Sequence, residues 1–232
     1  MSTAIIDYRT SEEEKVELKR LGLDIMLCPP CPELYTSISG HPDMQLVLIN
    51  YNTVVIHKNI NDMFCTQLKN RNITVYKSHS KLSQNYPHDI ILNSLVLGDI
   101  FVHNLKYSDH ILLDLVKEKK LVNVNQGYTK CSIAIVNEKA IITSDQSILK
   151  AMQNTLIDIL YVPPGDIELS GLEYGFIGGT CGLIKEGYLA FFGDLNQYIY
   201  GKSILQFLKK HNVLPIYLKE GRLIDRGSIL II

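Results

Sequence analysis

The sequence contains no tryptophan, few cysteines and no long apolar segment. The absence of tryptophan excludes nothing. The five cysteines are an odd number without the spacing of a disulfide framework, which favours a reducing compartment. No run approaches the ~18 apolar residues of a membrane span, and the N-terminus lacks the charged-then-apolar pattern of a signal peptide. We therefore expect a cytoplasmic protein without a membrane association.

Positively and negatively charged residues are also nearly equal in number. The formal net charge is −1, and no basic cluster exceeds residues 117–120 or the pair Lys209 and Lys210. This composition argues against a dedicated nucleic-acid binder. With 232 residues, of which 46% are apolar and 20% charged, the chain can bury a sizeable core. We predict a single domain over residues 1–232.

The sequence does contain an internal repeat. Each unit opens with a short apolar run, continues with two apolar runs around a polar turn, which predicts a β-hairpin, and ends with a helix. The C-terminal segment 228–232 would supply the first strand of the last hairpin, and the N-terminal segment 4–8 the second. A repeat completed by both chain ends predicts a closed ring. The five predicted units span residues 23–72, 73–121, 122–156, 157–212, and 213–232 continued by 1–22.

The hairpin register is regular. The pairs Asp43–His57 and Asp89–His103 are each 14 residues apart, and other units repeat a spacing of 12 residues. The two spacings differ by two residues, an even number, so each strand keeps the same face toward the core. The hairpin strands are predicted at residues 45–48 and 54–57, 90–92 and 100–103, 132–135 and 140–143, and 182–184 and 189–193.

A hairpin places the start of its first strand beside the end of its second strand. One rim of the ring therefore gathers all these positions, while the other rim has only tight turns, and we expect the chemistry on the first rim. The residues that enter first strands are His41, Asp43, His88, Asp89, Lys130, Cys131, Thr180, Cys181, Asp225 and Arg226; those that leave second strands are Asp7, His57, His103, Thr143 and Gly193.

Several motifs have simple structural explanations. The Cys28–Cys31 CxxC is followed by Pro32, so no helix begins there to activate a thiol, and one CxxC is only half a zinc site. His57 and His103 occupy equivalent positions, which we interpret as polar strand ends near solvent. A metal there would need further ligands, and the register offers only Asp7. We predict neither a metal nor a cofactor.

The glycine cluster 178–182 has two explanations that the sequence leaves open. Glycines allow a substrate to approach the backbone, or they let the chain turn inward. Cys181 within the cluster is more often an inert core residue than a nucleophile.

The best candidates for chemistry are Cys131 and His41. A cysteine attacks as the thiolate, so an active Cys131 would titrate below the free-thiol value of about 8.5. Lys130 is its neighbour in sequence. His41 would transfer protons, and Asp43 would position a cationic group.

Five strand–hairpin–helix units closed by the termini resemble the pentein, or β/α-propeller, fold of guanidine-group-modifying enzymes. The resemblance covers the whole chain, which is also similar to an uncharacterised bacterial family assigned that fold. Such enzymes use a cysteine nucleophile, a histidine acid/base and carboxylates that grip the guanidinium. The resemblance implies an α/β, five-fold pseudo-symmetric ring closed by the terminal strands.

The motifs of this family map onto the chain as a circular permutation. A Glu-Gly-Gly-Asp type motif is followed one unit later by His-x-Asp, and the cysteine comes two units further on. Here segment 225–228 is similar to the first motif, His41-Pro42-Asp43 follows, and Cys131 lies two units beyond. The resemblance implies catalysis by Cys131 and His41, and substrate contacts from Asp43, Asp225, Asp89, Lys130, Thr180 and Cys181.

The chain also departs from the family pattern. Aspartate replaces glutamate at 225, and Thr180 and Cys181 stand where the enzymes have a further carboxylate. Two functions follow: a cysteine-dependent hydrolase of guanidino or amidino C–N bonds in a small molecule, or a non-catalytic binding ring like a translation initiation factor of the same fold. Either function predicts a small-molecule or macromolecular ligand other than nucleic acid, and the oligomeric state is left open.

Overall fold

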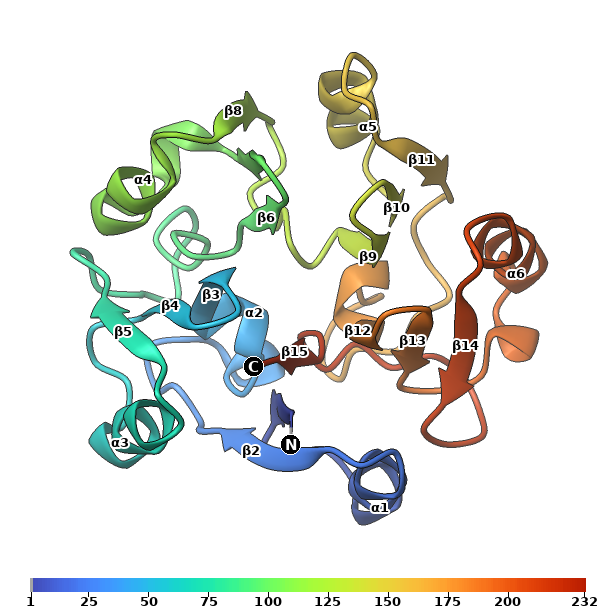
Figure 1. Cartoon of the computed structure of the whole chain (residues 1–232), viewed down its shortest axis with the longest axis horizontal. Coiled ribbons are helices and arrows are strands. Elements are labelled where there is room, and N and C mark those ends of the chain that lie inside the picture. The colour runs from blue at the N-terminus through green and yellow to red at the C-terminus, as the bar shows by residue number, and fades with distance from the viewer. Residues whose placement is uncertain (1) are drawn as a thin grey trace.

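Five three-stranded sheets of one design make up the protein (Figure 1). The computed structural model describes residues 2–232. In each sheet an antiparallel pair of strands is followed by a helix, which returns the chain to a third strand parallel to the second. A strand–helix–strand connection places the third strand beside the second, which explains the repeated order.

The elements follow this order with little variation. The first sheet contains β3 (Leu46–Asn50), β4 (Thr53–Ile56) and β5 (Thr74–Lys77), with α3 (Asp62–Asn70). The second contains β6 (Leu95–Leu97), β7 (Ile100–His103) and β8 (Lys120–Asn123), with α4 (His110–Val116). The third contains β9 (Ile133–Asn137), β10 (Ala140–Thr143) and β11 (Asp158–Tyr161), with α5 (Gln146–Met152). The fourth contains β12 (Cys181–Lys185), β13 (Tyr188–Phe191) and β14 (Leu214–Tyr217), with α6 (Gly201–Lys210).

The fifth sheet joins the two ends of the chain. It contains β15 (Leu230–Ile231), β1 (Thr3–Asp7) and β2 (Asp24–Cys28), with α1 (Glu12–Arg20). β15 pairs antiparallel with β1, and the backbone N–H of Thr3 donates to the carbonyl of Ile232 at 2.8 Å. The predicted pairing of the chain ends is therefore confirmed.

Two details of the predicted repeat are wrong. The apolar run that was expected to open each unit is the third strand of the preceding sheet, since β2 pairs with β1 and β11 with β10. Residues 90–92 form a turn instead of a strand, because the N–H of Asn93 bonds the carbonyl of Ile90 at 2.8 Å. The hairpin of the second sheet begins at Leu95.

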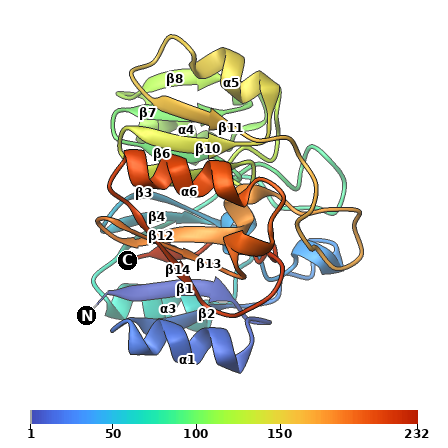
Figure 2. The same cartoon turned by 90° about the vertical axis from the view of Figure 1, so that its right-hand side faces the viewer.

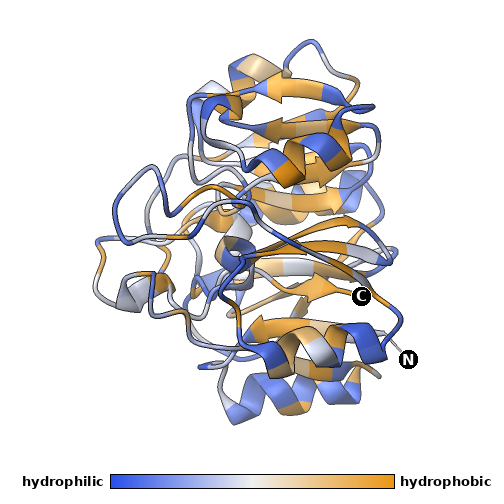
Figure 3. Ribbon diagram, turned by 90° about the vertical axis from the view of Figure 1, so that its left-hand side faces the viewer, coloured by the Kyte–Doolittle hydropathy of each residue, from blue (hydrophilic) through white to orange (hydrophobic). Residues whose placement is uncertain are grey.

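Apolar side chains fill the spaces between neighbouring sheets. One buried cluster combines β10 and β13 through Ile142 and Phe191, and another combines β6 and β9 through Leu95 and Ile133. Figure 3 shows hydrophobic strands inside and hydrophilic residues on the helices and loops. No helix among residues 2–232 has the length and apolar character that crossing a membrane requires.

The two ends of the molecule differ, and we name them for their connections. The loop face carries the long segments 29–42, 78–94, 163–180 and 219–229, which precede the first strand of a sheet. The turn face carries the hairpin turns and both chain termini. Figure 2 shows the long loops gathered on one side and the termini on the other. On the loop face lie three 3₁₀ helices and one short α-helix, namely η1 (Thr36–Ile38), η2 (Leu105–Tyr107), η3 (Ile177–Thr180) and α2 (Pro42–Gln45); a fourth 3₁₀ helix, η4 (Leu195–Gln197), follows β13.

Candidate functional site

Polar residues from different sheets meet at the centre of the loop face. Each comes from the segment just before a first strand, and these segments are helical or irregular turns rather than extended chain. α2 carries Asp43 and is preceded by His41, a turn before β9 carries Lys130 and Cys131, and the segment before β15 carries Asp225. Of these, only Lys130 is more than 3% exposed. The structure therefore brings together five of the predicted site residues.

His41 lies between two carboxylates. Its Nε2 is 3.9 Å from Oδ2 of Asp7, and its Nδ1 is 3.7 Å from Oδ1 of Asp225. Nδ1 has no hydrogen-bond partner among the described residues. Both nitrogens thus face a carboxylate beyond hydrogen-bond distance.

The two carboxylates beside the imidazole are held in different ways. The guanidinium of Arg9 binds Asp7 through both Nε and Nη2. Asp225 accepts from the backbone N–H groups of Phe176, at 2.8 Å, and Gly227, at 3.0 Å. Burial raises the pKa of Asp225, with the imidazole opposing this effect and Asp43 adding to it.

Within residues 2–232, only one of the two carboxylate oxygens of Asp43 accepts a hydrogen bond. Its Oδ2 accepts from the hydroxyl of Ser228 at 2.7 Å, and Nζ of Lys130 donates to that same hydroxyl oxygen at 2.9 Å. Ser228 has a φ of +74°, a left-handed conformation that is uncommon for a non-glycine residue. Oδ1 of Asp43 is buried and has no partner among residues 2–232.

Cys131 is a buried thiol with a polar neighbour. The side-chain amide of Asn93 donates to Sγ at 2.9 Å, while its Oδ1 accepts from the backbone N–H of Lys130 at 2.8 Å. Burial and the carboxylates of Asp43 and Asp225 raise the thiol pKa well above its ordinary value, although Asn93 and Lys130 oppose the rise. The shift is opposite to the one that an active nucleophile would need.

Sequence reasoning missed Asn93, which organises the Cys131 turn. Its residue type gives a weak signal, because an asparagine next to a serine after an apolar run resembles any loop. The amide also donates to the carbonyl of Asp43 at 2.9 Å, so one side chain connects two of the converging segments.

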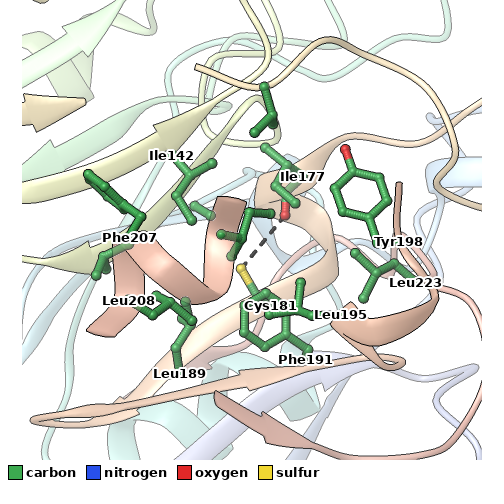
Figure 4. Packing of buried hydrophobic residues seen from close by; sticks show 14 of the residues in the cluster. Ile142, Ile177, Cys181, Leu189, Phe191, Leu195, Tyr198, Phe207, Leu208 and Leu223 are labelled. Atoms are coloured by element: carbon green, nitrogen blue, oxygen red, sulfur yellow. Dashed lines mark hydrogen bonds between the residues drawn. The ribbon is translucent and has the colours of Figure 1, made fainter. Parts of the chain in front are cut away.

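Three other predicted residues lie outside this centre. Asp89 accepts a hydrogen bond from the hydroxyl of Tyr128, and its Oδ1 has no partner within residues 2–232. Burial raises the pKa of Asp89. Thr180 donates to the carbonyl of Ile177 at 2.7 Å. Cys181 lies in an apolar cluster, where burial raises its pKa to about 12 (Figure 4).

Close packing explains the glycine cluster. A Cβ on Gly179 would lie 1.8 Å from Oδ1 of Asp225, and one on Gly178 would lie 2.3 Å from the carbonyl oxygen of Ile133. The structure favours the second explanation, that glycine lets the chain turn inward.

The paired histidines do not lie near solvent, as the sequence had suggested. His57 is 2% exposed and His103 is fully buried. His103 is held by Ser108 at 2.7 Å and by the carbonyl of Gly127 at 3.2 Å. Across residues 2–232, no three His, Cys, Asp or Glu side chains are placed to hold a metal ion.

Aromatic side chains lie beside the buried cluster that contains Cys131. Tyr35, Tyr128 and Phe176 pack against this cluster. The rings of Tyr128 and Phe176 stack with centroids 5.8 Å apart. The low exposure of His41, Asp43, Cys131 and Asp225 separates these four residues from solvent.

Three known structures with a similar fold are described as a dimethylaminohydrolase and two amidinotransferases. Dimethylarginine dimethylaminohydrolase from Pseudomonas aeruginosa, complexed with citrulline, superposes with a TM-score of 0.56 at 10% identity, over 93% of this chain and 90% of that chain. SxtG, an amidinotransferase from Microseira wollei in the saxitoxin biosynthetic pathway, gives 0.54 at 8% identity over 88% and 74%. Inosamine-phosphate amidinotransferase StrB1 from Streptomyces griseus gives 0.52 at 13% identity over 91% and 76%.

These similarities show the fold alone, which is the pentein fold of guanidine-group-modifying enzymes. No curated protein matches the sequence. Residues 5–230 match the sequence profile of the family of unknown function DUF6873, and the chain belongs to that family.

Proposed function

We propose that the protein binds a small compound with a guanidinium or amidinium group, and that Asp43 holds this group. The observation that carries the proposal is Oδ1 of Asp43, a buried carboxylate oxygen without a partner among the described residues. Burying such an oxygen is costly unless a donor reaches it. A planar guanidinium offers several N–H donors in the geometry that carboxylates accept best.

The charges around this oxygen also favour a cation. Two of three central carboxylates have a cationic neighbour: Arg9 binds Asp7, and the ammonium of Lys130 lies one hydroxyl away from Asp43. The third, Asp225, accepts hydrogen bonds only from backbone groups within residues 2–232. Counted formally, the three carboxylates together with Arg9 and Lys130 carry one net negative charge, which a cationic ligand would balance.

We infer further that the five sheets form a closed propeller around this centre. Pairing between β15 and β1 across the chain ends supports this architecture, as do the contacts between successive first strands β3 and β6, β9 and β12, and β12 and β15. The first strands lie nearest the centre in Figure 1.

A second function, cysteine-dependent hydrolysis, is favoured by one observation. Asp225, His41 and Cys131 converge in the unit order of the guanidine-group-modifying enzymes. In the proposed reaction the thiol proton passes to His41 as Sγ bonds to the guanidino carbon; the C–N bond breaks, and the amine leaves with that proton from His41. Water then attacks the same carbon and the C–S bond breaks, which releases a ureido compound and restores the thiol.

We favour binding without hydrolysis because of the raised pKa and the burial of the Cys131 thiol. Burial raises the pKa of Cys131, and the residue is only 2% exposed. A nucleophile needs a populated thiolate and room for the carbon that it attacks. Neither condition is met beside Sγ in this structure.

Replacing Asp43 by asparagine should weaken the binding of methylguanidinium at least tenfold. The substitution keeps the size of the side chain but removes its charge, and a hydrogen bond to a charged group is worth about 1.5–3 kcal/mol. Isothermal titration calorimetry measures the change. The matched control is Asp99→Asn, which alters an exposed aspartate in a hairpin turn. Equal affinity of wild type and Asp43→Asn would contradict the proposal.

Hydrolysis is tested on the same proteins by measuring the amine released from a panel of guanidino compounds. We expect the wild-type protein to release no more amine than Cys131→Ala does. Turnover that disappears in Cys131→Ala would instead establish the hydrolase. Turnover that persists in Cys131→Ala would exclude Cys131 as the nucleophile.

A further inference from the structure

A cavity of about 150 Å³ lies between the innermost strands and reaches Asp43 and Lys130. Its walls come from β3, β6, β9 and β15, which belong to four different sheets. The half-buried side chains Leu48, Val96 and Ile135 contribute to these walls, together with Leu230. A cavity of this kind is a usual setting for a small ligand.

The cavity is polar at one end and apolar along its length. First strands run from the loop face to the turn face, so Asp43, Ser94 and Lys130 lie toward the loop face. The aliphatic side chains at positions 48, 96, 135 and 230 lie further along their strands, toward the turn face. The unpartnered Oδ1 of Asp43 belongs to a side chain at the polar end.

The residues beside Asp43 at the centre of the loop face are closely packed. His41, Cys131 and Asp225 are each at most 3% exposed. A ligand whose cationic group reaches Asp43 must place the rest of its atoms where there is room, which is the apolar part of the cavity.

We propose that the ligand of the central site carries a small apolar arm, which lies in this cavity and points toward the turn face. The inference rests on the proposed binding of a guanidinium or amidinium group by Asp43. The ligand class is then an alkyl- or aryl-substituted guanidine or amidine. A compound with an amino-acid head would bury an ammonium and a carboxylate against aliphatic walls, which is costly.

A series of n-alkylguanidinium chlorides from methyl to pentyl tests this inference by calorimetry. Each methylene that enters an apolar site should strengthen binding about threefold to fourfold until the cavity is full. An affinity that is independent of chain length would overturn the inference. If the affinity is independent of chain length but methylguanidinium binding is lost in Asp43→Asn, the proposed function still stands. If no member of the series binds, both the proposed function and this inference are overturned.

Variants of Val96 locate the arm. Val96→Phe fills the cavity, so it should weaken pentylguanidinium binding at least tenfold and leave methylguanidinium within about twofold. Val96→Ala enlarges the cavity and should lengthen the alkyl chain that binds most tightly by one or two carbons. This variant tests the position of the arm if Val96→Phe fails to fold. Leu156→Phe is the matched control, since Leu156 is fully exposed and belongs to another part of the surface. An unchanged chain-length profile in both Val96 variants would place the arm elsewhere.

Discussion

Replacing Gly178 by alanine should lower the free energy of unfolding by about 3 kcal/mol or more. An added Cβ would lie 2.3 Å from the carbonyl oxygen of Ile133, 2.4 Å from that of Lys130 and 2.6 Å from that of Cys131. Backbone oxygens cannot rotate away as a flexible side chain can. The methyl group must therefore displace either η3 or the turn that carries Cys131.

The same substitution should also weaken ligand binding, because Gly178 supports the site. Its N–H donates to the carbonyl of Cys131 at 2.7 Å, and its own carbonyl is 2.7 Å from Oγ of Ser228, which bonds Asp43. Urea unfolding of the purified variants measures the stability change.

Gly98→Ala separates steric conflict from backbone strain. Gly98 has a φ of +52°, and apart from its two chain neighbours no described residue has an atom within 4 Å of an added Cβ. Its replacement should cost only the left-handed conformation, roughly 1–2 kcal/mol. If Gly178→Ala were no less stable than Gly98→Ala, the packing explanation of the glycine cluster would be wrong.

The repeat could be predicted from the sequence because each hairpin carries its own local signal. Apolar runs around a polar turn identify β3 with β4 and β9 with β10 almost to the residue. The boundaries between units could not be predicted in this way. An apolar run after a helix has the same sequence pattern whether it pairs with the strand before the helix or with the strand that follows. Only the path of the chain in three dimensions determines which of these two pairings forms.

The sequence predicts which residues meet on the loop face, but not the environment of each. Register alone places His41, Asp43 and Asp225 on one face. It does not reveal that Asn93 holds the Cys131 turn, or that the thiol is buried, since both depend on contacts between residues distant in sequence. The pKa of Cys131 depends on these contacts and is raised, whereas a catalytic Cys131 would need a lowered pKa.

Acidification from pH 6.5 to pH 4 should remove about 3 kcal/mol of stability for each of His57 and His103. Burial lowers the pKa of each imidazole from 6.5 to about 4. A lowered pKa in the folded state means that the unfolded chain binds protons first as the pH falls. The stability is complete above pH 6.5 and is lost as the pH falls through 4, while the raised pKa values of Asp89 and Asp225 act in the opposite direction.

His103→Gln isolates one of these two effects from the rest of the titration. No other ionisable group shifts the pKa of His103, and its two ring nitrogens contact Ser108 and the carbonyl of Gly127, so the folded state needs one neutral tautomer. At pH 7 the glutamine variant should be less stable than wild type, because these hydrogen bonds are disturbed. That deficit should shrink by about 3 kcal/mol between pH 6.5 and pH 4, because only the wild type loses the contribution of a neutral histidine. His79→Gln, at an exposed position, should leave the pH profile of unfolding unchanged. A deficit for His103→Gln that stays constant over this range would show that His103 accepts a proton without opening the fold.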